Sequence, residues 1–203
     1  MKIICIGRNY AEHAKELSNA VPEEPVFFLK PDTAITKSNQ PFYYPDFSKD
    51  IHHEIELVVK INRTGKNIEE KFAHKYYNEI TLGIDFTARD LQKKCKEKGL
   101  PWEKAKAFDG AAPVGNFVSK RAFEDLRDLN FHLNINENTV QKGNTGDMIF
   151  SIDAIIAYIS KFITLKNGDL IFTGTPAGVG PVKQGDLLEC FLEEDKLLKF
   201  SIK

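Results

Sequence analysis

The chain has 203 residues, 42% of them hydrophobic, which is enough to build the core of one domain of ordinary size. Because 28 basic residues nearly balance 29 acidic ones, the net charge of −1 argues against a nucleic-acid-binding protein and gives no reason to expect a membrane surface. No apolar run approaches the ~20 residues that span a bilayer, and the three cysteines form no CxxC pair, so we expect a cytoplasmic protein without a zinc site or a disulfide framework.

Apolar patterning and turn residues predict a single domain, residues 1–203, in which strands outnumber helices. Strands are predicted at residues 1–6, 26–29, 54–61, 80–86, 129–135, 139–141, 170–173, 187–192 and 197–202, and helices at 10–17, 68–77 and 89–98, with a further helix that begins at Ser151. Ser151 is the expected N-cap of that helix, and the isoleucines that follow it have helical spacing. Since the strands adjoin as hairpins, the predicted class is α+β with a mainly β core.

Two glutamates, Glu54 and Glu56, stand two residues apart inside an apolar run, and Asp85 follows at the end of the next predicted strand. Residues i and i+2 of a strand point to the same face, and unpaired buried carboxylates are very costly. A half-exposed strand with surface acids is the ordinary alternative. Here the other strand face is apolar too, so we favour a divalent ion held by all three carboxylates, either Mg²⁺ or Mn²⁺.

His13 and Glu16 are spaced so that they share one face of the first predicted helix. A carboxylate beside an imidazole orients the ring and raises its basicity, so the pair could act as a general base toward water. A surface helix with an incidental ion pair is the more common explanation of this spacing alone.

A lysine pair, Lys104 and Lys106, follows Trp102. An ammonium group near the metal would stabilise negative charge that develops on an enolate or oxyanion. A solvated basic segment explains the same residues, and chemistry alone does not separate the two lysines.

A glycine-rich loop at residues 174–180 follows the strand at 170–173. It lacks the Lys-Ser/Thr of a P-loop and is not a GxGxxG motif before a helix, so it predicts nucleotide binding only weakly. Its backbone amides and the Thr175 hydroxyl could still bind a substrate carboxylate. A tight turn between strands is the alternative.

The order of these motifs carries more information than any one of them. In sequence they are Gly7-Arg8-Asn9-Tyr10-x-x-His13-x-x-Glu16, Phe28-x-Lys30-Pro31, His53-Glu54-x-Glu56-Leu57, Gly83-x-Asp85-x-Thr87-x-Arg89-x-x-Gln92, Pro101-Trp102-x-x-x-Lys106-x-x-Asp109, Asn144-Thr145-x-x-Met148-Ile149-Phe150 and Gly168-Asp169-x-Ile171-x-Thr173-Gly174-Thr175-Pro176-x-Gly178-Val179-Gly180. Over nearly the whole chain this closely resembles the fumarylacetoacetate hydrolase family in its short single-domain form, and within it the acylpyruvase and oxaloacetate decarboxylase branch.

The resemblance implies a twisted, barrel-like β-roll with short helices, usually a homodimer. It implies Mg²⁺ or Mn²⁺ bound by Glu54, Glu56 and Asp85, with His13 and Glu16 on a mobile lid over the substrate and Lys106 aimed at the metal-bound oxygens. By the same matching, the substrate contacts are Arg89, Gln92 and Thr175. Gly110 departs from the pattern, because relatives often carry a hydroxyl residue there.

The resulting hypothesis is a metal-dependent hydrolase that cleaves a C–C bond in 3-acylpyruvates such as acetylpyruvate or fumarylpyruvate. The metal would act as electron sink, the His13 and Glu16 pair would activate water, and Lys106 would stabilise the developing charge. Decarboxylation of oxaloacetate needs only the electron sink, so it is a plausible further activity. The alternative enzyme is an isomerase or tautomerase of a 2-oxo or 2-hydroxy-diene diacid, or of oxaloacetate. A catalytically silent ligand-binding domain is the other class.

Overall fold

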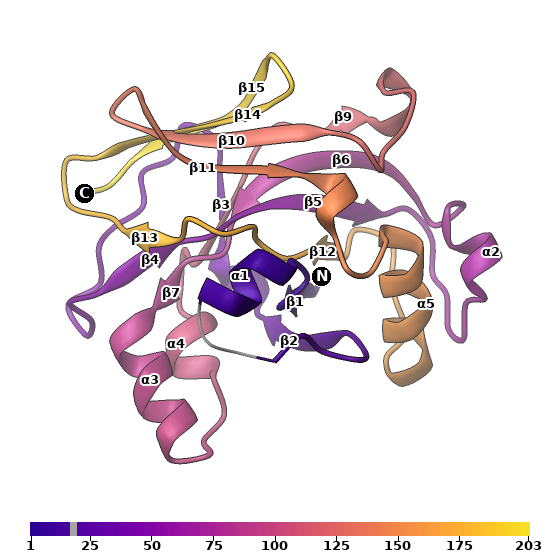
Figure 1. Cartoon of the computed structure of the whole chain (residues 1–203), viewed down its shortest axis with the longest axis horizontal. Helices are drawn as coiled ribbons and strands as arrows, with labels where there is room; N and C mark the ends of the chain where they lie inside the picture. The colour runs from indigo at the N-terminus through magenta and orange to yellow at the C-terminus, as the bar shows by residue number, and fades with distance from the viewer. Residues whose placement is uncertain (17–19) are drawn as a thin grey trace.

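The computed structural model describes residues 1–16 and 20–203, and its elements alternate short strands with a few short helices (Figure 1). The strands are β1 Ile3–Gly7, β2 Val26–Lys30, β3 Ile35–Lys37, β4 Ile51–His53, β5 Ile55–Ile61, β6 Tyr77–Ile84, β7 Thr87–Ala88, β8 Ala112–Val114, β9 Val118–Ser119, β10 Asn130–Ile135, β11 Asn138–Asn144, β12 Leu170–Phe172, β13 Gly180–Pro181, β14 Leu187–Leu192 and β15 Asp195–Ser201. The helices are α1 Ala11–Glu16, α2 Glu70–Ala73, α3 Arg89–Glu97, α4 Glu103–Lys106 and α5 Ile152–Phe162, and short 3₁₀ turns occupy Asp32–Ala34, Lys120–Ala122 and Thr145–Asp147.

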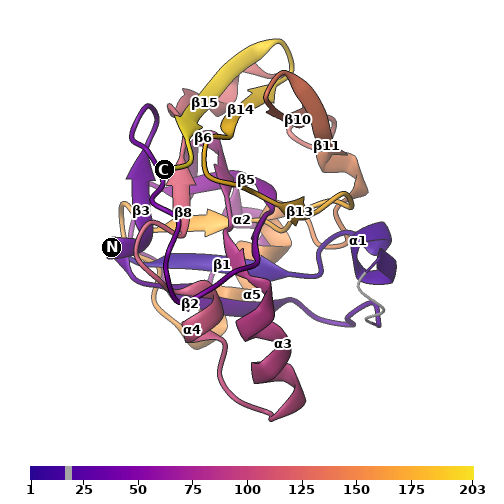
Figure 2. The ribbon, with the colours of Figure 1, turned by 90° about the vertical axis from the view of Figure 1, so that its left-hand side faces the viewer.

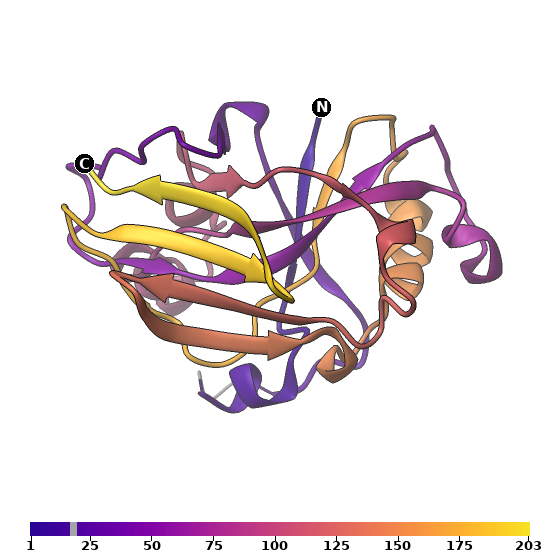
Figure 3. The ribbon, with the colours of Figure 1, turned by 90° about the horizontal axis from the view of Figure 1, so that it is seen from above.

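The largest sheet runs β2-β1-β12-β5-β6-β8-β3, with β9 paired to β6, and it mixes parallel and antiparallel neighbours. A four-stranded sheet, β11-β10-β14-β15, lies across β5 and β6 (Figure 3). The interior between these sheets is apolar, so β5 is buried along nearly its whole length. At Gly83 of β6 the packing is so close that a Cβ atom would lie 2.6 Å from the Phe172 ring. This curled, mainly β arrangement confirms the predicted α+β class.

Helix α5 forms where the isoleucine pattern predicts it. The Ser151 hydroxyl accepts a hydrogen bond from the Ala154 amide at its N-terminus, and one face of the helix is buried. Helix α3 also forms, and its chain leaves through Gly99 at φ +62°, a left-handed conformation that glycine adopts without strain. No helix of the described ranges is both long and apolar enough to cross a membrane.

One helix prediction needs correction, one helix was missed, and one prediction reaches beyond the described residues. The predicted helix at 68–77 is confined to α2, because Tyr77 already belongs to the long strand β6. Helix α4 was not predicted, since a single turn of Glu-Lys-Ala-Lys has no periodicity to detect. Helix α1 confirms most of the prediction at 10–17, whose last residue, Leu17, lies outside the described residues.

A small third sheet, β13-β4-β7, positions the candidate site. Strand β4 ends directly before Glu54, β7 begins two residues after Asp85, and β13 closes the glycine-rich loop. Pairing of His52 with Thr87 and of His53 with Gly180 therefore draws three distant chain segments together. Helices α3 and α4 pack against each other at the same end of the molecule (Figure 2), where they bring Arg89 and Lys106 to the site.

Candidate metal centre and active site

Three carboxylates converge in the interior. Glu54 occupies the one-residue break between β4 and β5, Glu56 lies within β5, and Asp85 follows β6. The antiparallel register of β5 and β6 pairs Glu56 with Gly83, and the Asp85 amide donates to the Glu54 carbonyl at 2.8 Å. One carboxylate oxygen from each residue lies within 4.8 Å of the other two, and all three side chains are buried.

This donor set fits a hard divalent cation. It consists of carboxylate oxygens alone, with no thiolate or imidazole in the group. Two oxygens that bind one Mg²⁺ at about 2.1 Å each are at most about 4.2 Å apart, so the observed spacing is nearly that of ligands to a single ion. The trio, which is the group of residues predicted from the sequence, could therefore hold Mg²⁺ or Mn²⁺.

Three cations surround the carboxylates. Lys106 Nζ lies 2.9 Å from Glu54 Oε2 and 2.7 Å from Asp85 Oδ2. The second guanidinium nitrogen of Arg89 lies 2.6 Å from Glu54 Oε1, and Lys30 Nζ lies 2.5 Å from Asp85 Oδ1. Lys106 is buried whereas Lys104 is exposed, so the structure separates the two lysines that the sequence left equivalent.

The electrostatic environments of the two glutamates differ. Burial acts to raise the pKa of Glu54, but Lys106 and Arg89 outweigh it and hold that pKa well below its usual range. Burial, followed by repulsion from Asp85 and Glu54, raises the pKa of Glu56. For Lys106, burial opposes the charged form, but attraction to Asp85 and Glu54 prevails and raises its pKa. A divalent cation would supply the charge that Glu56 lacks.

The predicted histidine–glutamate pair is present on α1. His13 Nδ1 lies 3.1 Å from Glu16 Oε2, and the imidazole is buried. A Glu16 acceptor at Nδ1 favours the tautomer in which Nδ1 carries the proton and Nε2 is the basic nitrogen. Glu16 Oε1 also accepts a hydrogen bond from the Gly178 amide at 3.1 Å. The pair is thereby tied to the glycine-rich loop.

Two amides of the glycine-rich loop bind carboxylates of the protein itself. The Gly174 amide donates to Glu56 Oε2 at 2.7 Å, and the Gly178 amide donates to Glu16. From the sequence, these loop amides were candidates for binding a substrate carboxylate. In the structure these two amides position the metal site and the His13 pair instead, and the Thr175 hydroxyl donates to the Ile55 carbonyl at 2.8 Å.

Asn9 anchors the segment that leads into α1, although its place in the sequence predicted no role for it. Its side-chain amide donates to the carbonyls of Phe150 and Thr173 at 3.0 and 2.8 Å, and its oxygen accepts from the Phe150 amide at 2.7 Å. A bridge between Tyr10 and Met148 adds backbone pairing. These contacts fix the start of the helix that carries His13.

Two further buried side chains support the site without having been singled out. Lys30, besides its ion pair with Asp85, donates to the Ala111 carbonyl at 2.6 Å. Gln141 of β11 accepts from the Ile55 amide at 3.1 Å and donates to Thr175 Oγ1 and to the Pro176 carbonyl at 2.7 and 2.8 Å. Lys30 belongs to the motif Phe28-x-Lys30-Pro31, and the apolar residues before it could have indicated that it is buried. Gln141 carried no local signal at all.

The candidate residues share one small cavity of about 40 Å³. By residue, its lining comprises Ile6, Gly7, Arg8, His13, Val26, Phe28, Glu54, Glu56, Asp85, Arg89, Gln92, Lys96, Trp102, Lys106 and Thr175. Every predicted site residue except Glu16 is among them. Arg89 and Gln92 are bonded to each other at 2.7 Å, so their polar groups are aligned at one wall. The edge-to-face pair of Phe28 and Trp102 forms an apolar wall.

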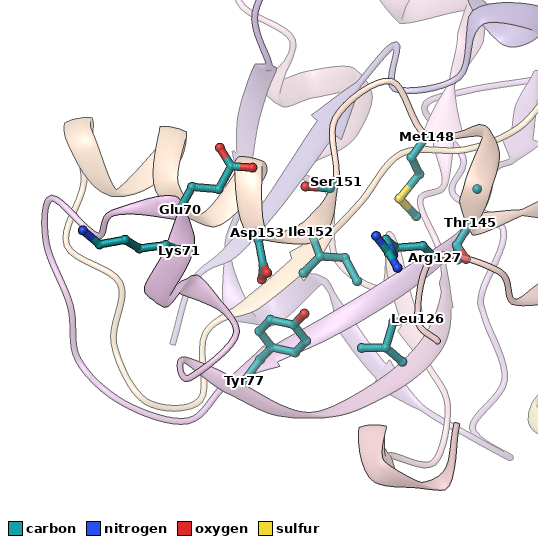
Figure 4. Close-up of a pocket in the computed structure, with 11 residues that line it drawn as sticks. Glu70, Lys71, Tyr77, Leu126, Arg127, Thr145, Met148, Ser151, Ile152 and Asp153 are labelled. Atoms are coloured by element: carbon teal, nitrogen blue, oxygen red, sulfur yellow. The ribbon is translucent and has the colours of Figure 1, made fainter. Parts of the chain in front are cut away.

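A larger cavity of about 610 Å³ lies elsewhere, between α2, the start of α5 and the turn at residues 145–148 (Figure 4). Its carboxylates are Glu70, which is exposed, and Asp153, which is half-buried beside Tyr77. It contains no group of converging acids comparable with the trio. Size alone would favour this cavity, but charge and geometry assign the candidate chemistry to the smaller one.

The fold and the buried carboxylate site are those of a metal-site enzyme. The family model described as "Fumarylacetoacetate (FAA) hydrolase C-terminal" matches residues 2–199. The chain therefore belongs to the fumarylacetoacetate hydrolase family, as the order of its motifs predicted.

Similar proteins give the family a finer context. The mitochondrial oxaloacetate tautomerase FAHD1 of Mus musculus is 46% identical over 201 residues, covering 99% of this chain and 91% of the relative. The mitochondrial oxaloacetate decarboxylase of Dictyostelium discoideum is 45% identical over 190 residues, covering 93% and 87%. A fumarylpyruvate hydrolase from Pseudomonas aeruginosa, solved in complex with Mn²⁺ and pyruvate, superposes with a TM-score of 0.94 at 34% identity, covering 100% of this chain and 89% of that one.

Proposed function

We propose that this protein is a divalent-metal-dependent oxaloacetate tautomerase, which interconverts the enol and keto forms of that 2-oxo diacid. The observation that carries the proposal is the buried carboxylate trio with Lys106 within 3 Å of two of its members. The names of the similar proteins support this alternative better than the C–C hydrolase that was our main sequence-based hypothesis.

Glu54, Glu56 and Asp85 would hold Mg²⁺ or Mn²⁺, and the bound ion would supply a Lewis acid that favours ionisation of the substrate. Lys106 would stabilise negative charge on the enolate oxygen, because its raised pKa keeps it cationic at neutral pH. Arg89, Gln92 and Thr175 are the proposed substrate contacts at the cavity wall.

His13 is the proposed acid–base group. With Glu16 accepting from Nδ1, its Nε2 would remove a proton from C3 of the keto form, and the electron pair would move toward the C2 oxygen. That oxygen takes a proton from water to give the enol, and protonated His13 returns its proton to water. In the reverse direction the oxygen proton is lost and protonated His13 returns a proton to C3, so no C–C bond breaks.

Cleavage of a C–C bond is the second candidate. Decarboxylation would use the same enolate, and hydrolysis of an acylpyruvate would add a water activated by the His13 pair. The decarboxylase of Dictyostelium discoideum and the fumarylpyruvate hydrolase of Pseudomonas aeruginosa favour retaining this candidate.

One set of assays separates the candidates. Purified protein with Mg²⁺ or Mn²⁺ is given enol-oxaloacetate and acetylpyruvate, and enol loss, CO₂ release and acetate release are followed together. The proposal expects enol loss to be fastest, with strong reduction by a chelator and in Lys106→Met but not in Lys104→Met. Uncatalysed enol decay beside rapid acetate release would establish the hydrolase instead.

A further inference from the structure

Two cations that line the site cavity, Arg8 and Lys96, have no carboxylate partner. Lys106, Arg89 and Lys30 are each ion-paired to the trio. Among residues 1–16 and 20–203, by contrast, no side-chain hydrogen bond or ion pair joins Arg8 or Lys96 to an acid. The three remaining residues are Leu, Ser and Asn and carry no carboxylate.

These two positive charges line the same cavity. Arg8 follows strand β1 and Lys96 lies in the last turn of α3, yet both contribute to the same lining. Lys96 is exposed, and partial burial of its ammonium group, followed by repulsion from Arg89 and Arg8, lowers its pKa. Lys96 Nζ also lies 5.7 Å from the centre of the Trp102 ring.

The backbone at Arg8 has an unusual conformation. Its φ of +61° is a left-handed conformation that a non-glycine residue adopts only when its surroundings impose it. The neighbours do so here, since Gly7 is paired in β1 and Asn9 is fixed by its three side-chain hydrogen bonds.

The charges of the cavity explain what such a pair would bind. Lys30, Lys106 and Arg89 pair with Glu54 and Asp85, and a divalent cation would complement Glu56, so Arg8 and Lys96 remain as an uncompensated positive end. A cavity with unpaired cations attracts and retains anionic groups. A 2-oxo diacid would bind through its C1 carboxylate and C2 oxygen to the ion held by the trio, and its second carboxylate would lie at the other end of the molecule.

We propose that Arg8 and Lys96 form the subsite for the distal carboxylate of the substrate and thereby select 2-oxo diacids over 2-oxo monoacids. This inference rests on the proposed function for the orientation of the substrate. It names a specificity determinant that the carboxylate trio and the His13 pair do not provide, because both would act equally on acetylpyruvate and on oxaloacetate.

The test compares the binding of two unreactive probes with the same four-carbon skeleton. L-Malate and L-2-hydroxybutyrate share the C1 carboxylate and the 2-hydroxyl, and only malate has the distal carboxylate. Calorimetric titration of the Mg²⁺-loaded protein gives the ratio of the two affinities. One charge-assisted hydrogen bond corresponds to roughly 10- to 100-fold in affinity, so we expect the wild-type protein to prefer malate at least about tenfold.

The variants are Lys96→Met and Arg8→Asn, the latter because asparagine tolerates the left-handed backbone. We expect each to lower the malate preference about tenfold and to raise KM for oxaloacetate more than it lowers kcat. Lys94→Met, which removes a charge of the same helix that does not line the cavity, is the matched control and should keep the wild-type ratio.

A wild-type protein without preference for malate, or variants whose ratio stays within twofold of wild type, would overturn the inference. Failure of the proposed function gives a different result. In that case the wild-type protein would still prefer malate, and the variants would still lose the preference, while enol-oxaloacetate would decay at its uncatalysed rate.

Discussion

Replacing Lys106 by methionine tests whether its ammonium holds the carboxylate site together. The substitution keeps the length of the side chain but removes contacts of 2.9 Å to Glu54 and 2.7 Å to Asp85 in a buried setting. Loss of one partner from a buried ion pair costs about 3–5 kcal/mol. Arg89 and Lys30 remain beside the same acids, so we expect about 3 kcal/mol of lost unfolding free energy at pH 7 in the presence of a chelator.

The loss should depend on pH in a defined direction. The pKa of Glu54 is lowered in the folded state, so its contribution is present above its unfolded pKa of about 4.3 and disappears as pH falls through the folded value. The pKa of Lys106 is raised, so its contribution is complete below about 10.4 and disappears at higher pH. The difference between wild type and variant should therefore be largest between about pH 5 and pH 10 and shrink toward pH 3.

Urea unfolding at pH 7 and pH 3.5 measures both quantities, with Lys104→Met as the exposed control that should stay near wild type. Added Mg²⁺ should stabilise Lys106→Met more than wild type, because the ion supplies positive charge that the variant lacks. A difference below about 1 kcal/mol at pH 7, or one that is the same at both pH values, would refute the electrostatic argument.

Three other substitutions probe the neighbours of this site. His13→Gln should lower kcat for tautomerisation by roughly 10²- to 10⁴-fold while Mn²⁺ still binds, and a rate within threefold of wild type would remove His13 from the chemistry. Gln141→Leu leaves the buried Ile55 amide and Pro176 carbonyl without their hydrogen-bond partner, so urea unfolding should show a loss of about 2–4 kcal/mol in unfolding free energy. A loss below about 1 kcal/mol would show that the Gln141 hydrogen bonds are dispensable. Gly174→Ala forces a Cβ atom to 2.6 Å from Asn9 at φ +102°, so we expect at least about 2 kcal/mol of destabilisation and weaker Mn²⁺ binding; unchanged values would mean that the loop adjusts freely.

Local patterns predicted the elements whose own sequence determines them. The isoleucine spacing after Ser151 predicted α5, and short apolar runs bounded by turn residues predicted β5, β14 and most of the remaining long strands. The predicted helix at 68–77 was too long because pairing with Ile61 of β5 draws Tyr77 into β6, which is a tertiary effect. Strands as short as β7 and β13 have too few residues to show any periodicity.

The site residues, too, divide into those that local sequence marks and those that only the folded structure reveals. Glu54 and Glu56 were recognisable because two acids inside an apolar run call for a compensating charge, and Asp85 because it stands at the end of the predicted partner strand. Gln141 lies on the second sheet, 86 residues from Ile55, and nothing near it in sequence marks it as a contact of β5. Arg8 belongs to the motif Gly7-Arg8-Asn9-Tyr10, but only the folded structure shows that it has no carboxylate partner among the described residues.

The central claim is that the carboxylate trio binds the divalent ion on which tautomerisation depends. Its most direct test titrates Mn²⁺ into wild type and Glu56→Gln and measures binding and enol-oxaloacetate turnover in the same samples. We predict that wild-type activity rises in proportion to bound Mn²⁺ and that Glu56→Gln loses both together. Full turnover in Glu56→Gln, or wild-type turnover that is unchanged when Mn²⁺ is removed by a chelator, would contradict the account.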